Sequence, residues 1–368
     1  CHSKKLTRYI NLGKQPFSNS FLKYKDIKKE KKFPLIVVLC KKCGLSQLSI
    51  IPNTKFIFNK YDYLSSFSKP LSNHYKDLVQ KIIKKYKILY KDTVLDIGCN
   101  DGVLLKHYPK KFFNVVGIEP SSASKYIKQK RIKLINKFFN FSATEEYLRK
   151  FKKPKIITIT NVLAQIDDLN HFAKSLENIT NKDSLIVIEF PYLLHMINKG
   201  LFDIIYHEHL SYFSLTPLAF LFNKFNMEIV DYEKINFGAS GPALRVYLSK
   251  KNSRYEVSKK VEKQIRNEKI WGVRKIEKYK IFNKKTNLKI RKFKKNIFKF
   301  TAENNNKKIN KYTPGTHIKI VSDRVFLKKK INYAILLSWN YKKFFLTKSL
   351  FKKNGGKFII PFPTPHIK

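Results

Sequence analysis

Two acidic residues stand where a sheet could present them to a nucleoside cofactor. Asp96 lies in the run VLDIGCNDG, and Glu119 lies 23 positions later in GIEPS. Gly98 and Gly102 enclose a short loop after Asp96, and glycines permit the tight turns in which backbone approaches a ligand closely. A carboxylate that ends the next strand can accept hydrogen bonds from both hydroxyls of a ribose. The spacing therefore predicts a nucleoside-binding loop.

The residues inside this loop distinguish between two classes of cofactor. A dinucleotide site favours Gly-x-Gly-x-x-Gly, which leaves room for a pyrophosphate. Here Cys99, Asn100 and Asp101 separate the glycines, and a carboxylate repels a pyrophosphate but attracts the ammonium group of S-adenosylmethionine. We therefore expect S-adenosylmethionine rather than NAD, with Cys99 as a small buried loop residue. The expected cofactor site comprises Asp96, Gly98, Asn100, Asp101, Glu119 and Asn161, the last of which directly follows a strand.

Alternating strand and helix patterns must hold these residues in place. Short apolar runs alternate with amphipathic segments, a pattern typical of a parallel α/β sheet with right-handed crossovers. Strands are expected at 93–97, 114–119, 155–160, 184–189 and 227–232, with shorter ones at 317–321, 332–337 and 357–361. Helical stretches are expected at 73–86, from 103–107 onward, and in the Lys-rich region from 250 to about 298. Because such sheets bind ligands at the carboxyl ends of their strands, Asp96 and Glu119 should share one edge.

The charge of the chain allows two interpretations. The formal net charge is +50, from 76 Lys and Arg residues against 26 Asp and Glu residues. Such a charge can indicate nucleic-acid binding, but the excess is mostly Lys and is spread along the whole chain. We interpret it as compositional bias and expect no specific nucleic-acid partner. A basic zinc-ribbon protein that binds nucleic acid is the competing interpretation, and it predicts steeply salt-dependent binding.

Apolar segments and cysteines indicate the compartment. No apolar stretch is long enough to span a bilayer, and the first residues contain no apolar segment typical of a secretion signal. Four cysteines suit a metal site or a core in a reducing compartment better than a disulfide framework. We therefore expect a cytoplasmic protein without a membrane partner. Cys40 and Cys43 have the Cys-x-x-Cys spacing that suits tetrahedral zinc.

Several motifs follow one another in the order found in one enzyme family. They include NLGKQPFSNSFL, CKKCGLSQL, YDYLSSFS, VLDIGCNDGVLL, NVLAQIDDLNHF, IEFPYLLHMI, FDIIYHEHLSYFS, GPALRVY and YTPGTHIKI. On these motifs the chain resembles the sugar C-methyltransferases that act on nucleotide-linked 4-keto-deoxyhexoses. The resemblance implies an α/β protein with a zinc-binding domain at 1–70, a Rossmann-like class I methyltransferase domain at 71–250 and a shortened C-terminal α/β domain at 251–368. It also implies a nucleotide-linked keto-deoxysugar as the substrate.

The substrate class defines the chemistry that the resemblance implies. A proton on the carbon beside a ketone can be removed if the resulting enolate oxygen is stabilised, and the enolate carbon then attacks the methyl group. In YHEHLSYFS, His209 is expected to be the base, because an imidazole titrates near the working pH. Glu208 is expected to orient the base or bind a sugar hydroxyl, and Tyr206 to donate to the oxyanion. His207 is interpreted as structural.

Three further side chains are expected near the substrate. Tyr61 and Tyr63 match the family's substrate-facing tyrosines, although ordinary packing is an equally good interpretation for them. Gln165 stands where the family usually has His, and an amide can hydrogen-bond but cannot exchange a proton at neutral pH. If that His normally assists the reaction, this enzyme works differently or more slowly. Two alternatives to a sugar C-methyltransferase therefore stay open. One is an inactive homologue that binds the cofactor, and the other is a methyltransferase that acts on an oxygen or nitrogen of another small metabolite.

The terminal regions depart from the family pattern. The family's zinc site uses two cysteine pairs, and Cys1 matches the second cysteine of the first pair. We therefore expect a truncated N-terminus that has lost one ligand, and a structural zinc held by Cys1, Cys40 and Cys43. The family's glycine-rich loop before TPGTHI has no counterpart here. Such loops contact phosphate or sugar through backbone N–H groups, so its loss affects the expected role of the C-terminal domain. The oligomeric state is not predicted.

Overall fold

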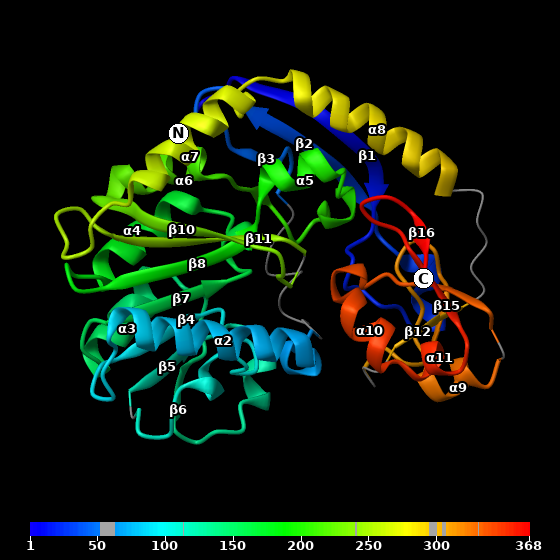
Figure 1. The fold of residues 1–368 in the computed structure, drawn as a ribbon, viewed down its shortest axis with the longest axis horizontal. Helices are drawn as coiled ribbons and strands as arrows, with labels where there is room; N and C mark the ends of the chain where they lie inside the picture. The colour runs from blue at the N-terminus through cyan, green and yellow to red at the C-terminus, as the bar shows by residue number, and fades with distance from the viewer. Residues whose placement is uncertain (52–62, 113, 240, 294–299, 304–306, 330) are drawn as a thin grey trace.

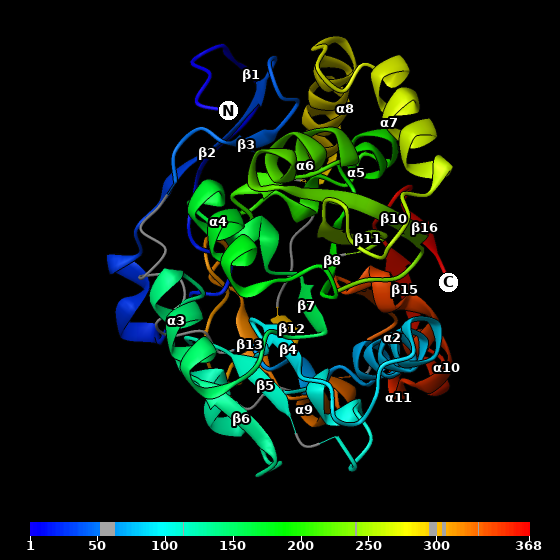
Figure 2. The same ribbon diagram turned by 90° about the vertical axis from the view of Figure 1, so that its left-hand side faces the viewer.

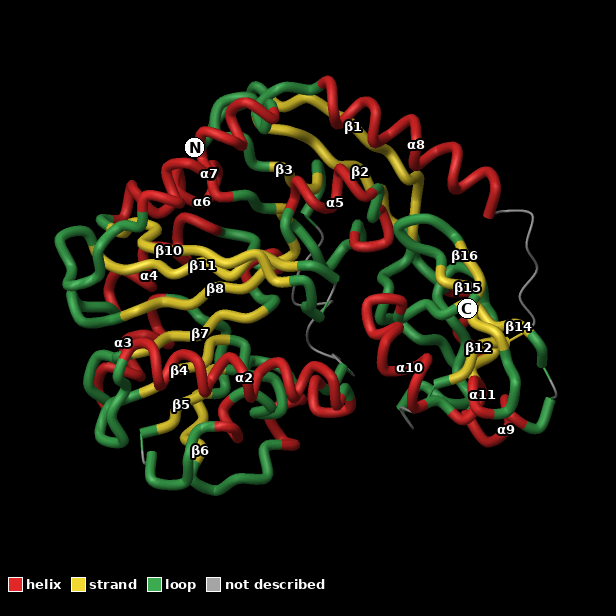
Figure 3. The backbone as a smooth tube through the Cα atoms, viewed as in Figure 1, coloured by secondary structure: helices red, strands yellow, loops and turns green. Residues whose placement is uncertain are grey.

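Three groups of elements make up the fold (Figure 1). The computed structural model describes residues 1–51, 63–112, 114–239, 241–293, 300–303, 307–329 and 331–368. A large α/β unit lies on the left of the view, and a smaller unit that holds the C-terminus lies on the right. Strands near the N-terminus arch from one unit to the other, and helix α8 (Glu277–Phe293) runs along strand β1 (Leu6–Gln15) on this arch (Figure 3).

A seven-stranded sheet forms the centre of the large unit. Its order is β10-β11-β8-β7-β4-β5-β6. The bounds are β4 (Val94–Ile97), β5 (Val115–Ile118), β6 (Ile132–Ile135), β7 (Ile156–Thr160), β8 (Leu185–Pro191), β10 (Met227–Ile235) and β11 (Ala243–Lys250). The five strands from β8 to β6 are parallel, and β10 and β11 complete the edge as an antiparallel pair. The near-continuous apolar runs of β4 and β8 fit parallel strands that are buried on both faces.

Helices cover both faces of this sheet (Figure 2). Helix α2 (Lys69–Tyr86) packs its apolar stripe against side chains of one face, including those of Val94 and Val115. On the other face, α4 (Leu169–Ile179) packs against Leu95 and Ile188. The remaining helices of this part of the chain are α3 (Phe141–Lys150), α5 (Leu193–Lys199), α6 (Leu215–Phe222) and α7 (Lys259–Trp271). The fold class predicted from the alternation, a Rossmann-like α/β domain, is therefore confirmed, with a mixed sheet in place of a purely parallel one.

Caps define where several of these helices begin. The Ser68 hydroxyl accepts a hydrogen bond from the N–H of Leu71, and Pro70 occupies the first turn of α2. The Asp168 carboxylate accepts from the N–H of His171 at the start of α4. Each cap satisfies a backbone donor that the helix itself leaves unpaired. These caps fix the starts of α2 and α4, which both reach the edge of the sheet where β4, β5 and β7 end.

A four-stranded antiparallel sheet includes strands from two distant parts of the sequence. It consists of β1, β2 (Phe33–Cys40), β3 (Ser46–Leu48) and β9 (Ser211–Tyr212), in that order. The N–H of Leu48 donates to the carbonyl oxygen of Leu210 at 2.8 Å, and the N–H of Leu210 donates to Ala164 at 2.7 Å. The N-terminal region is therefore joined by backbone hydrogen bonds to the segment that follows YHEH.

The C-terminal unit is built from short elements around a small core (Figure 3). Strands β12 (Phe300–Ala302) and β13 (Lys319–Val321) form a parallel pair, and β14 (Tyr333–Ile335), β15 (Lys357–Ile360) and β16 (His366–Ile367) form a second sheet. The helices are α9 (Asp323–Leu327), α10 (Lys342–Lys348) and α11 (Leu350–Lys353). The buried side chains of its core are those of Leu336, Phe351, Phe358 and Ile360.

The structure differs from the expected elements in several places. The helix expected from 103 does not form. Only a short 3-10 turn (η3, Leu105–His107) is present there. Pro109 accounts for this ending, since proline disfavours helical backbone in the residue before it, and Tyr108 is extended with φ −63° and ψ 138°. Strand β6 has no predicted counterpart, and β10 pairs antiparallel with β11. Within the described residues, no helix is both long enough and apolar enough to cross a bilayer.

Candidate active site

A cavity of about 830 Å³ opens at the carboxyl ends of β4, β5 and β7. Asp96 and Glu119 both line it, so the two carboxylates predicted to act together share one site. Gly98, Asn100 and Asn161 lie in the same wall. The C-terminal unit also contributes to the lining, through Lys308, Leu337 and Ser338. The described residues that line the cavity range from Ser18 to Ser338, so parts of the chain more than 300 positions apart in the sequence meet there.

Asp96 is a buried carboxyl group in the floor of the cavity. Only 2% of the residue is exposed. Burial raises the pKa of Asp96 to about 7, and the charge of Glu119 adds to this rise. The hydroxyl of Thr158 donates to Oδ1 at 2.6 Å and opposes the rise. A carboxyl group with such a pKa is poised to gain or lose its proton near neutrality. A cation brought into the cavity would favour its charged form.

Glu119 organises the loop that the glycines enclose. Its Oε2 accepts the backbone N–H of Asn100 at 2.8 Å, and its Oε1 accepts that of Ser121 at 2.9 Å. The carboxylate is 6% exposed, so it lies at the cavity surface with one partner on each oxygen. Each carboxylate oxygen retains further acceptor capacity. Glu119 can therefore hold the loop and still accept hydrogen bonds from a ligand.

The two residues in the middle of the loop connect it to the segment before α2. Asn100 has a left-handed backbone (φ 52°); its Oδ1 accepts the N–H of Ser65, and its Nδ2 donates to the carbonyl oxygen of Tyr63. Asp101 binds the same segment: its Oδ2 accepts the N–H of Ser66 at 3.1 Å, and it is not among the described residues that line the cavity. Asn100 thus lines the cavity, whereas Asp101 holds the loop against the segment before α2.

Tyr206 and His209 form a hydrogen-bonded pair in the cavity wall. The His209 Nδ1 lies 2.9 Å from the carbonyl oxygen of Ile204, which can only accept, so Nδ1 carries the proton. Its Nε2 then accepts from the Tyr206 hydroxyl at 2.8 Å. Burial lowers the pKa of His209 to about 4, partly opposed by the bond to Ile204. The imidazole is therefore neutral at pH 7, with its free electron pair directed toward the phenol.

Glu208 does not line the cavity but holds a segment that does. Its two carboxylate oxygens share the proton of the Ser18 hydroxyl, whose oxygen lies 3.0 and 2.9 Å from them, and Asn19 donates two hydrogen bonds, one from its backbone N–H and one from Nδ2. Ser18 and Asn19 both line the cavity beside Tyr206. The residue is only 1% exposed. Its place in the structure is that of a positioning residue for the N-terminal segment.

The neighbouring His207 is packed away from the cavity. Its Nε2 lies 3.3 Å from the carbonyl oxygen of Pro34, and its ring meets that of Phe17 edge to face. Only 1% of the residue is exposed. This environment agrees with the structural interpretation of His207.

The structure brings most of the substrate residues expected from the sequence to the same cavity. Tyr63 and Gln165 line it, whereas Tyr61 lies outside the described residues. Sequence reasoning missed Ser18, Asn19 and Lys308 as lining residues. Ser18 and Asn19 fall within the motif NLGKQPFSNSFL, which supported the resemblance without indicating a role for its serine and asparagine.

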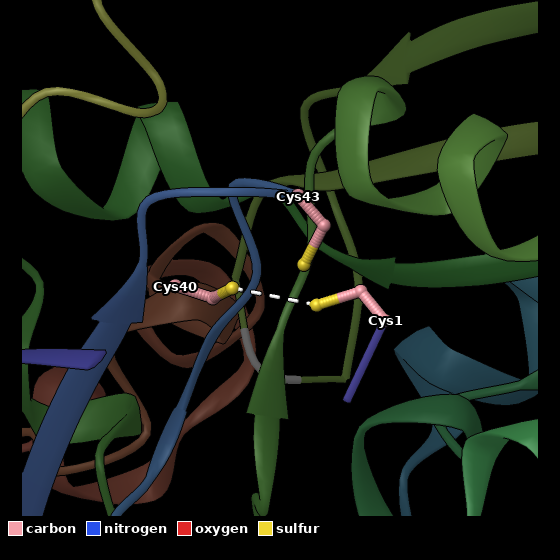
Figure 4. Close-up of side chains that lie close together, drawn as sticks. All are labelled: Cys1, Cys40 and Cys43. Carbon is pink, nitrogen blue, oxygen red and sulfur yellow. Dashed lines mark hydrogen bonds between the residues drawn. The ribbon is translucent and has the colours of Figure 1, made fainter. Parts of the chain in front are cut away.

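Three cysteines meet at the turn after β2 (Figure 4). The Sγ atoms of Cys1, Cys40 and Cys43 all lie within 4.8 Å of one another, with Cys1 and Cys40 at 3.5 Å. Burial tends to raise the pKa of the Cys40 thiol, but the N–H groups of Cys43 and Lys42 lower it overall, which favours the thiolate that binds metal. Three converging sulfurs fit a zinc ion. Within the described residues the cluster contains these three ligands and does not include His2.

Replacing Cys43 by serine is expected to release the metal and lower the thermal midpoint of unfolding by about 5 °C or more, because binding at such sites contributes several kcal/mol of folding free energy. Metal content by elemental analysis and a thermal scan would measure both effects. Cys99→Ser is the matched control for metal content, since Cys99 is a free cysteine apart from the cluster. Unchanged metal content in Cys43→Ser would contradict the assignment.

Three family models match successive parts of the chain. A model described as "Putative zinc binding domain" matches residues 1–58, a methyltransferase domain model matches residues 68–232, and a C-methyltransferase C-terminal domain model matches residues 285–363. The second match contains both carboxylates and the Tyr206–His209 pair. The chain is an S-adenosylmethionine-dependent methyltransferase. The third match confirms the resemblance of this methyltransferase to C-methyltransferases.

Known proteins similar to the methyltransferase include one curated relative. C-methyltransferase NovU of Streptomyces niveus is 24% identical over 393 aligned residues, which cover 97% of this chain and 93% of NovU. Matched solved structures include S-adenosylmethionine-dependent methyltransferases of Clostridium acetobutylicum (11% identity, TM-score 0.38, 48% of this chain and 91% of the other) and Archaeoglobus fulgidus (17% identity, TM-score 0.36, 48% and 94%). The similarity to NovU extends over all three matched regions.

Proposed function

We propose that this enzyme transfers a methyl group from S-adenosylmethionine to a carbon beside the ketone of a nucleotide-linked deoxysugar. The observation that carries the proposal is the placement of the Tyr206–His209 pair in the same cavity as Asp96 and Glu119. The similarity to NovU, a C-methyltransferase by name, supports carbon as the acceptor atom. Under this proposal the domains at 1–70, 71–250 and 251–368 bind zinc, hold the cofactor and assist the substrate, respectively.

The strand-edge side of the cavity suits S-adenosylmethionine. Glu119 offers carboxylate oxygens to the ribose hydroxyls, and Asp96 offers a buried carboxyl group that can balance a cation. Asn100 and Asn161 add amide groups, and Gly98 leaves room for a ligand to approach the backbone. Asp101 supports this site indirectly by holding the loop against Ser66. The volume of the cavity is in the range of known cofactor sites.

The other side of the cavity supplies the groups that the acceptor needs. When a ketone oxygen takes the place of His209 as the partner of the Tyr206 hydroxyl, the Nε2 electron pair becomes free to remove the α-proton. The C–H bond then breaks, its electrons form the enolate double bond, and Tyr206 donates to the enolate oxygen. S-adenosylmethionine held by Asp96 and Glu119 would supply the electrophilic methyl group for the enolate carbon and would leave as S-adenosylhomocysteine. Burial disfavours the imidazolium of His209, so His209 releases the proton to solvent as the product leaves.

Gln165, Tyr63 and Glu208 complete this side of the site. Gln165 and Tyr63 line the cavity and are proposed to bind the sugar by hydrogen bonds. Tyr61 is proposed to assist them on the strength of the resemblance alone. Glu208 fixes Ser18 and Asn19 against the acceptor, and so acts by positioning rather than by contact with the reacting atoms. Because Gln165 cannot exchange a proton, the proton transfer depends on His209.

The proposal is tested by calorimetric titration with S-adenosylmethionine, followed by incubation with a thymidine-diphospho-4-keto-deoxyhexose. We expect cofactor binding and a product whose mass has increased by one methylene group, with a new C–CH₃ signal in the NMR spectrum. An O–CH₃ or N–CH₃ signal would show a different acceptor atom. Cofactor binding without turnover would indicate an inactive homologue.

The affinity for S-adenosylmethionine is expected to rise about tenfold between roughly pH 6 and pH 8, because a cation favours ionised Asp96, whose pKa without ligand is about 7. The stability of the ligand-free protein is expected to change with pH in the opposite direction. The pKa of Asp96 is raised above its ordinary value of 3.8, so its protonation stabilises the fold at low pH, and this contribution is lost as the pH rises through about 7. Titration calorimetry at several pH values measures the effect, and Asp96→Asn should abolish the pH dependence.

A further inference from the structure

The charged side chains that line the cavity are unevenly distributed. Four carboxylates contribute to the wall: Asp96, Glu119, Asp167 and Asp168. Within the described part of the lining, Lys308 supplies the single Lys or Arg side chain, although the chain as a whole contains 76 of them. A strongly basic protein therefore places one basic side chain in a predominantly acidic cavity. We therefore expect the ammonium group of Lys308 to bind a specific anionic ligand.

Lys308 is held in place before any ligand arrives. Its Nζ lies 3.1 Å from Oε2 of Glu303, and its side chain is 15% exposed. The ammonium group also lies 4.9 Å from the centre of the Phe21 ring, a favourable cation–π distance. Two partners from different parts of the chain thus restrict its movement. An ammonium group has three donors, so the bond to Glu303 leaves two for a further acceptor.

The surroundings of Lys308 belong to the acceptor side of the cavity. The backbone N–H of Phe21 donates to the carbonyl oxygen of Asn19, and Asn19 is bound by Glu208 beside the Tyr206–His209 pair. The carboxylates Asp96 and Glu119 lie instead at the ends of β4 and β5, where they suit a cation and a ribose. The anion that Lys308 meets should therefore belong to the methyl acceptor.

We propose that Lys308 binds a phosphate group of the methyl acceptor and so takes part in recognising the nucleoside diphosphate portion of the substrate. This inference rests on the proposed function, because it requires an acceptor that carries phosphate. Lysine is a strong phosphate ligand that acts as a compact point charge. Glu303 and Phe21 keep the ammonium group pointed into the cavity, and the phosphate adds to these contacts. The carboxylate of the bound cofactor is the other anion that could occupy this place, and the test separates the two.

The test compares the unmodified protein with Lys308→Met, which replaces the lysine by an unbranched side chain without a charge. Three probes are titrated: thymidine diphosphate, thymidine and S-adenosylhomocysteine. The affinity of Lys308→Met for thymidine diphosphate is expected to fall about 10–100-fold, whereas its affinities for the other two probes stay within about twofold. Retained binding of S-adenosylhomocysteine also shows that the variant is folded.

Lys307→Met is the matched control. Lys307 is the neighbouring lysine, but its ammonium group lies over the exposed ring of Tyr126 at 4.5 Å, and it is not among the described residues that line the cavity. This variant should bind all three probes as the unmodified protein does.

Two outcomes overturn the inference while leaving the proposed function in place: unchanged affinity of Lys308→Met for thymidine diphosphate, or a selective loss of S-adenosylhomocysteine binding, which would assign Lys308 to the cofactor. In both cases the unmodified protein still methylates the keto-sugar. If the unmodified protein binds S-adenosylhomocysteine but neither binds thymidine diphosphate nor methylates the sugar, the proposed acceptor and the role of Lys308 are both wrong.

Discussion

Replacing His209 by asparagine is expected to lower kcat about 10²–10⁴-fold, the usual contribution of a positioned base. Asparagine can still donate to the carbonyl oxygen of Ile204, but it offers no basic electron pair at the place of Nε2. The affinity for S-adenosylhomocysteine should remain within about twofold, because His209 lies on the acceptor side of the cavity. Single-turnover kinetics and calorimetry measure the two effects separately.

Two comparisons sharpen this prediction. Tyr206→Phe removes the donor to the enolate oxygen and should also lower kcat without changing cofactor affinity, whereas His207→Asn should leave the chemical step largely intact.

The pH profile of kcat provides a further readout. With a pKa of about 4, His209 is neutral above roughly pH 5, so kcat should not show the inflection near pH 6.5 that an ordinary histidine produces. Unchanged turnover in His209→Asn would remove it from the mechanism.

Glu119→Ala is expected to weaken binding of S-adenosylhomocysteine about 10–100-fold. The substitution removes the proposed acceptor for the ribose hydroxyls and also releases the N–H groups of Asn100 and Ser121, which shape the loop. Titration calorimetry measures the loss directly. Glu119→Gln should lose less, because an amide oxygen can still accept one of these bonds.

Glu145→Ala is the matched control for this variant. Glu145 is an exposed glutamate on α3, so its removal makes the same change in net charge without touching the cavity. If both variants bind the cofactor equally well, the loop of Glu119 is not the cofactor site, and the proposed reaction loses its foundation.

The meeting of Asp96 and Glu119 in one cavity could be predicted from the sequence because local pattern determines it. Asp96 lies near the end of the short apolar strand β4, Glu119 directly follows β5, and these parallel strands place their carboxyl ends at one edge. Asp101 was predicted to bind the cofactor, but it is not among the described residues that line the cavity. Spacing cannot show on which side of a tight loop a side chain emerges, and this one is directed toward Ser66.

The acceptor side depends on contacts that no local pattern reveals. Ser18 and Glu208 are 190 positions apart, yet the Ser18 hydroxyl donates to the Glu208 carboxylate and so helps to complete the wall. Lys308 looks like any other lysine in a Lys-rich segment, and only the fold sets it apart. The absence of the helix expected from 103 has a simpler and local cause, since Pro109 disfavours helical backbone at Tyr108.

The pairing of β3 with β9 affects how the protein comes to be assembled. The sheet that carries two of the three cysteines lacks its last strand until residue 212 has left the ribosome, so its closure involves contacts of long sequence separation, which form slowly. The same pairing places Ser211 and Tyr212 only two residues beyond His209. Pairing of β3 with β9 therefore also holds the segment that carries the proposed base, and a chain in which this pairing had not formed would lack that support.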